Sequence, residues 1–331
     1  MGRYSAVTAL ASLITRSRNE SPVEVRSIFF FLRNTDKGRA MKHHNSVKIL
    51  EKGYEKLVGE YQRFDLPDVV VKTFGLNPGW NAVIGTNGCC GVAMSFQDNN
   101  PLYGADQTLQ DLEYLRSCVG SSHFDVARAN MTEPRVSRRS IALTTLNALS
   151  QPFVTDEMLQ SKGFSTGIEV KDLVKNDDKL VIVGYGGLVK SYAGRCRELH
   201  VTDQRPLETF RTTIVGETVS YGPAGITVHH AEENREVLRD ADIAIITGST
   251  LVNGTFEEVV GYAKHARIRA LYGSSAQLIP DVLFENGINI VMSVAISDPA
   301  RFAADLMNAP DMETALRKHQ RKYNVGCGDI L

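Results

Sequence analysis

The sequence predicts an α/β protein in which a parallel sheet, covered by helices on both faces, follows a smaller α+β domain. Apolar runs without polar alternation, at Leu180–Val183 and Ile243–Ile246, are typical of strands buried on both faces of a parallel sheet. Helical segments alternate with such strands throughout the second half of the chain, as they do in open α/β sheets. In the first half, one helix precedes three strand-like segments joined by short turns.

Composition limits the classes of function. The chain has 331 residues, of which 43% are hydrophobic and 23% charged, as in globular proteins with room for two domains. The net charge of −1 gives no reason to expect nucleic acid or an anionic membrane as a partner. No apolar run approaches ~18 residues, so no membrane span is expected. The five cysteines are an odd number and form no CxxC pair. We therefore expect a cytoplasmic location. We also expect a homo-oligomer that binds a small-molecule ligand.

Residues 1–46 are predicted to form an extension ahead of both domains. Met1–Asn19 contains three arginines and no acid, which loosely resembles a transit peptide, although a solvated amphipathic extension is favoured. The apolar segment Val25–Leu32 is expected to be a strand or an oligomer contact. The neighbouring His43 and His44 are not expected to be metal ligands, because adjacent residues do not share one helical face.

Residues 47–160 are predicted to form the smaller domain. Apolar side chains recur at helical spacing over Ser46–Arg63, with Ser46 as the N-cap. β-branched segments separated by Asn-Pro-Gly and Asn-Gly turns predict three strands, at Asp68–Phe74, Trp80–Ile84 and Cys90–Phe96. Further helices are expected from Thr108 onward and over Ser137–Leu149. The polar stretch Thr155–Lys175 is the expected boundary.

Residues 161–331 are predicted to form the larger domain, which begins as a nucleotide-binding βαβ unit does. A buried strand leads into the turn Gly184-Tyr185-Gly186-Gly187. A short helix-like segment, Leu188–Arg195, follows, and then a strand that ends at Asp203. Asp203 lies 19 residues after Gly184, the approximate spacing of a carboxylate that binds ribose hydroxyls. Val189 stands where a dinucleotide fingerprint has its third glycine. S-adenosylmethionine is therefore favoured over a nicotinamide dinucleotide.

Strands and helices alternate over the rest of the chain. Strands are expected at Ile226–Val228, Ala241–Thr247, Ile268–Tyr272 and Ile288–Val294, the last being the final strand. Helices are expected at Ala231–Arg239, Phe256–Ala266, Pro280–Asn286 and Pro299–Met307.

Several of these segments resemble a known family. They are ADIAIITGSTLVNGT, ALYGSSAQLIPDVLFENGINIVMSVAISDP, the VGYGG turn, the VTD strand end and the helix SIALTTLNALSQP. Together they resemble the two-domain proteins described as putative heavy-metal chelation proteins, over about residues 47–310. The resemblance implies an enolase-N-terminal-like α+β domain followed by a Rossmann-like domain. It also implies a site in a cleft between the domains and a role in chelating or handling metal.

Ligands of open α/β sheets bind beyond the carboxyl ends of the strands, where five polar loops of this chain are expected to gather. The candidate cofactor-binding residues are Gly184, Tyr185, Gly186, Gly187, Asp203, Thr247, Gly248, Ser249, Thr250, Asn253 and Ser274. Backbone N–H groups at helix starts in such loops bind phosphate or carboxylate. Nothing in the sequence identifies catalytic residues, and no nucleophile elbow is present.

A divalent transition metal is a further possible cofactor, since such ions prefer imidazole and thiolate ligands. His229 and His230 are the candidate ligands, while Cys89 and Cys90 are better explained as small buried residues. Three hypotheses stay open. In the first, the protein is an enzyme that binds a small molecule and handles metal. In the second, it is an S-adenosylmethionine-dependent transferase or lyase/cyclase, and in the third it is a non-enzymatic metallochaperone.

Overall fold

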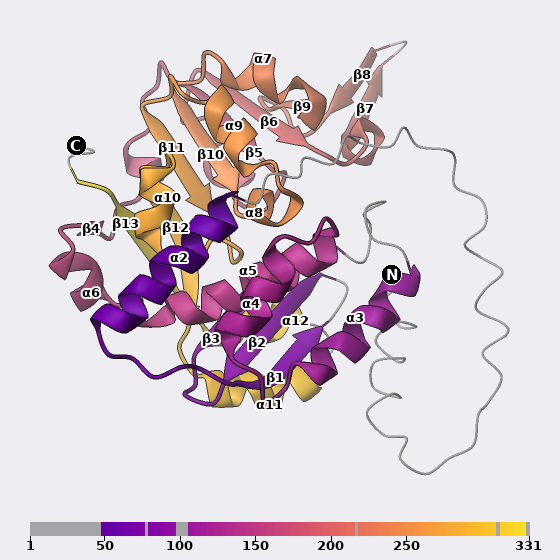
Figure 1. Ribbon diagram of the computed structural model, residues 1–331. Helices are drawn as coiled ribbons and strands as arrows, with labels where there is room; N and C mark the ends of the chain where they lie inside the picture. The colour runs from indigo at the N-terminus through magenta and orange to yellow at the C-terminus, as the bar shows by residue number, and fades with distance from the viewer. Residues whose placement is uncertain (1–47, 77–78, 97–104, 216–217, 309–311, 329–331) are drawn as a thin grey trace, which may run out of the picture. The chain divides into compact units, whose positions relative to one another are not determined.

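The computed structural model describes residues 48–76, 79–96, 105–215, 218–308 and 312–328 (Figure 1). Residues 45–331 form one compact unit. The expectations for the extension at residues 1–46, including Val25–Leu32 and His43-His44, fall outside the described residues, as does the Ser46 cap. None of the described helices is long and apolar enough to cross a membrane.

The first half contains the expected helix and a three-stranded antiparallel sheet. Helix α2 spans Lys48–Arg63, and the strands β1, β2 and β3 span Val71–Leu76, Trp80–Gly85 and Cys90–Met94. The strand order is β1-β2-β3. Gly88 adopts φ +85° in the turn before β3, a conformation that favours glycine. The Asn87-Gly88 pair thus makes the hairpin that the sequence predicts.

Three helices follow, and the last of them is the most completely buried. They are α3 (Ala105–Ser117), α4 (His123–Met131) and α5 (Val136–Ser150), of which α4 was not foreseen. Nearly every residue of α5 is buried. The hydroxyls of Thr144 and Thr145 donate to carbonyls four residues earlier in the same helix, at 2.7 and 2.8 Å. The buried Arg139 instead donates to the carbonyl of Val252 at 2.9 Å, so the polar groups of α5 find partners both within the helix and outside it.

Helix α5 packs closely against strand β3 at Gly91. A Cβ atom added there would lie 2.1 Å from the carbonyl oxygen of Thr144 and 2.3 Å from the backbone nitrogen of Ala148. Only a glycine allows the strand and the helix to approach this closely.

The second half forms an eight-stranded sheet in the order β4-β13-β12-β11-β10-β5-β6-β9. The six strands from β12 to β9 run parallel, which confirms the predicted α/β class. Two strands were missed, because β13 and β4 add antiparallel to one edge. The bounds are β4 Ser165–Thr166, β5 Lys179–Val183, β6 Glu198–Asp203, β9 Thr227–His230, β10 Ile243–Thr247, β11 Ile268–Tyr272, β12 Ile290–Ile296 and β13 Gln320–Gly326.

The second half of the chain also contains short helices. They are α6 (Asp156–Ser161), α7 (Asn234–Leu238), α8 (Ser249–Asn253), α9 (Phe256–Tyr262), α10 (Pro280–Glu285), α11 (Pro299–Asn308) and α12 (Met312–His319). Single 3₁₀ turns occur at η2 (Gln151–Phe153), η3 (Val170–Asp172), η4 (Val189–Ser191), η5 (Leu207–Phe210) and η6 (Ala231–Glu233). A hairpin of β7 (Arg211–Val215) and β8 (Thr218–Tyr221) was also not predicted.

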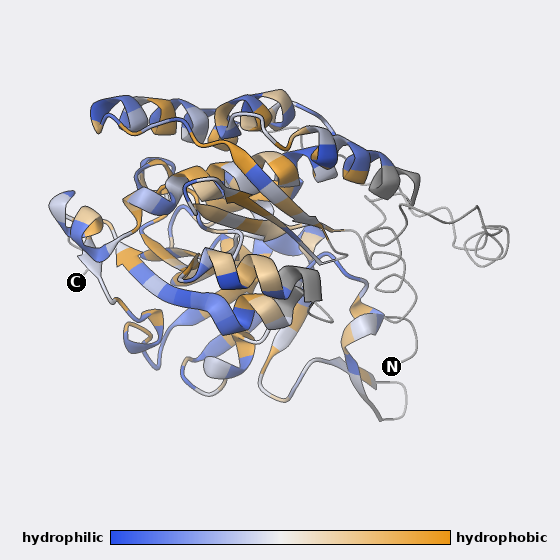
Figure 2. Cartoon of the chain, turned by 90° about the horizontal axis from the view of Figure 1, so that it is seen from below, coloured by the Kyte–Doolittle hydropathy of each residue, from blue (hydrophilic) through white to orange (hydrophobic). Residues whose placement is uncertain are grey.

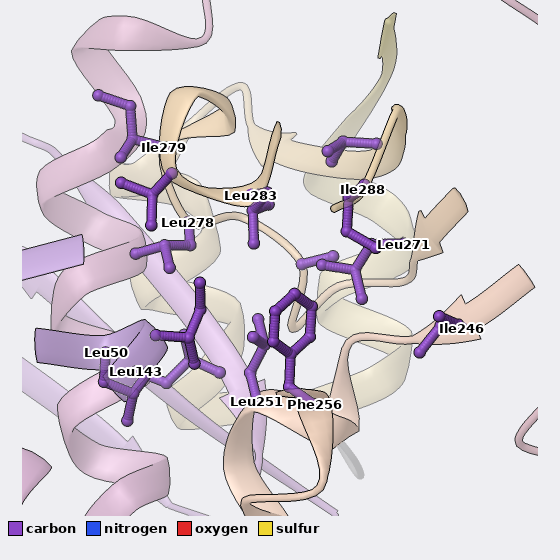
Figure 3. Packing of buried hydrophobic residues seen from close by; sticks show 14 of the residues in the cluster. Leu50, Leu143, Ile246, Leu251, Phe256, Leu271, Leu278, Ile279, Leu283 and Ile288 are labelled. Atoms are coloured by element: carbon purple, nitrogen blue, oxygen red, sulfur yellow. The ribbon is translucent and has the colours of Figure 1, made fainter. Parts of the chain in front are cut away.

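Two hydrophobic clusters connect the halves of the chain. In the first, Leu50 of α2 and Leu143 of α5 pack with Leu251, Phe256 and Leu278 from the second half (Figure 3). The second joins the three-stranded sheet to the last two helices, through the buried residues Ala82, Ile84, Cys90, Val92, Ile296, Phe302, Ala315 and Leu316. The predicted domain boundary near residue 160 stays a prediction. Figure 2 shows hydrophobic residues concentrated on the inner strands and hydrophilic residues towards the periphery.

Candidate functional site at the carboxyl edge of the sheet

The Gly184 turn lies where three neighbouring strands end. Gly184 adopts φ +97°, and its N–H donates to the Thr202 carbonyl at 2.8 Å. A Cβ atom added at Gly184 would lie 3.1 Å from the Thr247 side chain at the end of β10. The Tyr272 hydroxyl, at the end of β11, donates to the Gly184 carbonyl at 3.1 Å. The strand ends thus bring the turn, Thr247 and Tyr272 into contact.

Asp203, at the end of β6, is held by an extensive set of hydrogen bonds. Its Oδ2 accepts from the Tyr185 N–H at 2.8 Å and from Arg205 Nη2 at 3.0 Å. Its Oδ1 accepts from the Arg205 N–H at 2.8 Å and from Arg205 Nε at 2.9 Å. An ionised carboxylate offers about four acceptor positions, and all four are used here. Asp203 therefore fixes the turn and the guanidinium, and it has no acceptor position left for a ribose hydroxyl.

The segment after the turn differs from the predicted helix. Only the 3₁₀ turn η4 forms, over three residues, and Val189 is fully buried in the cluster beneath the sheet. The N-terminal turn of an α-helix is what binds pyrophosphate in dinucleotide folds, and η4 does not supply one. Together with the filled acceptor positions of Asp203, this geometry does not favour either adenosyl ligand considered from the sequence.

The predicted loop at Thr247–Thr255 is largely a helix. Helix α8 buries Thr250, and Asn253 Oδ1 accepts from the N–H and the hydroxyl of Thr255, at 3.1 and 2.7 Å. A Cβ atom at Gly248 would lie 2.7 Å from the backbone nitrogen of Ala276, so this glycine permits close packing. These three residues have structural roles that the sequence did not reveal.

Ser249 remains at the edge and contacts the first half of the chain. Its hydroxyl lies 3.2 Å from Thr247 Oγ1 and 3.4 Å from the sulfur of Met94, the last residue of β3. The Met94 N–H donates to the hydroxyl of buried Ser275 at 2.9 Å. Ser274, which the sequence singled out, is half-buried beside it. The end of β3 therefore borders this edge, although the cleft that the family resemblance implies stays a prediction.

Arg205 is the residue that sequence reasoning missed. Its guanidinium carbon lies 4.9 Å from the centre of the Phe210 ring, which itself packs against Tyr185 at 4.9 Å. Nη2 also donates to the Tyr185 carbonyl at 2.8 Å. The side chain is 45% exposed, and among the described residues no acceptor lies at Nη1. Its position two residues after a strand-end acid was the only available signal.

Burial raises the pKa of Tyr272 to about 12, helped by the nearby charge of Asp203. Tyr272 therefore keeps its proton at neutral pH and acts as a hydrogen-bond donor beside the turn. The edge thus presents the Arg205 guanidinium, paired with the Asp203 carboxylate, together with hydroxyl groups from Tyr272, Thr247 and Ser249.

The histidines chosen as metal candidates do not converge. His229 Nε2 lies 2.9 Å from Nδ1 of His200, and His229 Nδ1 lies 3.0 Å from Glu233. His230 is one residue further along β9, and its Nδ1 accepts from the Glu232 N–H at 3.5 Å. Adjacent residues of a strand point to opposite faces, which separates the two rings.

The cysteines lie elsewhere. Cys90 is paired with Ile84 at the start of β3, whereas Met94 at the other end borders the sheet edge. Burial raises the pKa of the Cys90 thiol, which makes a metal-binding thiolate unfavourable. Within the described ranges, no group of three or more His, Cys, Asp or Glu side chains is placed to hold a metal ion.

Comparison with known proteins shows which family this chain resembles. Two family models match, at residues 61–150 and 167–325, and both are described as "Putative heavy-metal chelation". An uncharacterized protein of Methanocaldococcus jannaschii is 24% identical over 209 residues, which are 63% of this chain and 70% of that protein.

Two solved structures share the fold, both titled as proteins of unknown function from the DUF364 family. The Pyrococcus horikoshii structure gives a TM-score of 0.62 at 18% identity and covers 84% of this chain and 100% of its own. The Desulfitobacterium hafniense structure gives 0.61 at 18% identity and covers 85% and 99%. The chain therefore belongs to the two-domain family described as putative heavy-metal chelation proteins.

Proposed function

We propose that this protein binds a small anionic metabolite of the metal-chelating type at the carboxyl edge of its sheet, with Arg205 as the principal contact. The observation that carries the proposal is that the Arg205 side chain is held in one orientation and still has a nitrogen atom available to a ligand. Asp203, the Tyr185 carbonyl and the Phe210 ring fix the guanidinium, and Nη1 has no acceptor among the described residues.

A guanidinium held in this way is suited to a carboxylate. Because it is already oriented, little side-chain entropy is lost when a ligand binds. The hydroxyls of Tyr272, Thr247 and Ser249 at the same edge can bond to further oxygen atoms of the ligand. Small chelators carry several carboxylate and hydroxyl groups, which match one cation surrounded by hydroxyls. The family description, heavy-metal chelation, agrees with a ligand of this class.

The other hypotheses make different demands on the same residues. An S-adenosylmethionine-dependent enzyme would need Arg205 to release Asp203 before ribose hydroxyls could bind there. A metallochaperone would bind metal without a chelating metabolite. The anionic ligand leaves all four hydrogen bonds of Asp203 in place and needs only the hydroxyls of Tyr272, Thr247 and Ser249 to turn towards it, and for that reason we prefer it.

Citrate serves as the probe for this proposal. We expect isothermal titration calorimetry to show citrate binding that weakens about 10- to 100-fold in Arg205→Gln, the loss expected for one charge-assisted hydrogen bond. Arg211→Gln is the matched control, because Arg211 is an exposed arginine on the neighbouring strand β7. Equal weakening in both variants, or no effect of Arg205→Gln, would contradict the proposal.

Native mass spectrometry of the freshly purified chain gives a second test that needs no variant. A co-purified polycarboxylate supports the proposal, whereas co-purified S-adenosylmethionine would support the adenosyl alternative instead. The same spectrum reports the oligomeric state, for which a homo-oligomer is our expectation.

A further inference from the structure

Two histidines from different strands face each other on one side of the sheet. His200 is in β6 and His229 is in β9, and the register sets His229 opposite Thr202. Residues 200, 202 and 229 therefore point to the same face. The rings stack with centroids 5.2 Å apart, and His200 Nδ1 lies 2.9 Å from His229 Nε2.

A carboxylate contacts the outer nitrogen of each ring. Glu198 Oε2 lies 3.2 Å from His200 Nε2, and Glu233 Oε2 lies 3.0 Å from His229 Nδ1. Ionised carboxylates only accept hydrogen bonds, so both outer nitrogens carry the proton. In two neutral rings, the inner nitrogens then both present lone pairs, towards each other. Lone pairs at 2.9 Å repel, and either a proton or a metal ion held between them removes the repulsion.

We propose that His200 and His229 are the two protein ligands of a site for a single divalent transition-metal ion. A histidine that binds a metal generally donates its other ring N–H to a carboxylate, which fixes the tautomer. Glu198 and Glu233 hold both rings in that way. Imidazole suits zinc, copper and nickel. At zinc–nitrogen distances of about 2.0–2.1 Å and a tetrahedral angle, the two nitrogens would lie about 3.3 Å apart. The nitrogens would have to move apart by about 0.4 Å, and each ring would have to turn so that its lone pair points at the ion instead of at the other ring.

The surroundings leave room for further ligands of such an ion. Both imidazoles have side chains that are 18% exposed, so water can complete the coordination. The hydroxyl of Thr202, on the same face and opposite His229, is buried without a hydrogen-bond partner in the described structure.

This site is separate from the carboxyl-edge site. His200 and Asp203 are three positions apart on β6, so their side chains point to opposite faces of the sheet. The metal proposal therefore does not rest on the binding of an anion at Arg205, and each can fail without the other.

Calorimetry with Zn²⁺ on the full-length protein tests the metal site. We expect one equivalent to bind, with affinity reduced at least about 10-fold in His200→Gln and in His229→Gln. Glu233→Gln should weaken binding about 10- to 100-fold, the usual effect of losing a carboxylate behind a ligating histidine. His230→Gln is the matched control, since it removes the adjacent imidazole on the other face and should bind as the wild type does.

Cu²⁺ provides a readout that does not depend on how well single variants fold. Electron paramagnetic resonance of the wild type with one equivalent of Cu²⁺ should show superhyperfine coupling to two imidazole nitrogens. That signal should persist in His230→Gln and disappear when His200 and His229 are both replaced by Gln. Absence of nitrogen coupling in the wild type, its persistence in the double variant, or loss of Zn²⁺ binding in His230→Gln would each overturn the proposal.

Discussion

Acid should destabilise this protein through His123, a fully buried histidine at the start of α4. Its Nδ1 lies 2.8 Å from the Val69 carbonyl, to which the His123 backbone N–H also donates at 2.8 Å. The carbonyl can only accept, so Nδ1 carries the proton. Nε2 is buried without a partner in the described structure, and protonation there would place an uncompensated charge in the core. Burial accordingly lowers the pKa of His123 to about 4.

The direction of the effect follows from linkage. An unfolded chain has a histidine pKa near 6.5, so between pH 6.5 and pH 4 the unfolded state binds more protons than the folded state. Stability therefore falls as the pH is lowered through this window. Between pH 7 and pH 5 the loss works out at about 2 kcal/mol, and below pH 4 it approaches about 3 kcal/mol.

Comparison with His123→Asn isolates this contribution. The asparagine amide can donate to the Val69 carbonyl as Nδ1 does, but it does not titrate. Urea denaturation at pH 7 and pH 5 should show that the wild type loses about 2 kcal/mol more unfolding free energy than the variant does. Every other titrating group is common to both proteins. Parallel losses in the two proteins would refute the assignment of acid sensitivity to His123.

Three further predictions concern packing and charge. Gly91→Ala should lower the free energy of unfolding by about 3 kcal/mol or more, because its Cβ would meet the backbone of α5. Gly59→Ala, with open space around it in α2, should raise the free energy of unfolding by about 0.5–1 kcal/mol. Similar values for the two variants in chemical denaturation would contradict the packing described. Val189→Gly should lower the free energy of unfolding by about 3 kcal/mol in the same measurement, because Val189 is fully buried. The variant should still not bind NAD⁺ in calorimetry, and a gain of NAD⁺ affinity would show that the η4 turn is no barrier to a dinucleotide. Lys162→Met should lower the free energy of unfolding by about 3 kcal/mol at neutral pH, because the lysine lies 2.9 Å from Asp281 and 3.3 Å from Glu60 in a largely buried network. Lys171→Met, in an exposed pair, should change it by less than about 1 kcal/mol. Equal effects of the two substitutions would argue against the buried network.

Much of the secondary structure could be read from local patterns. The apolar runs that became β5 and β10, the amphipathic helix α2 and the hairpin turn at Gly88 each depend on residues close together in the chain. Strand β13 could not be read in this way, because its segment QRKYNVG is mostly polar. It becomes a strand only because β12 offers an edge, against which Tyr323 and Val325 are buried.

Local patterns in the sequence were sufficient to predict that the Gly184 turn, Asp203 and the Thr247 strand end would meet at one edge of a parallel sheet. Alternation of strands and helices is enough to place carboxyl ends together. The contacts that those residues make could be seen only in the folded chain. Asp203 turns towards Arg205 and the turn, and His229 pairs with His200 while His230 points away. The contact between His200 and His229 depends on the register of strands β6 and β9, and these residues are 29 positions apart in the chain. A pattern of neighbouring residues does not encode such a register.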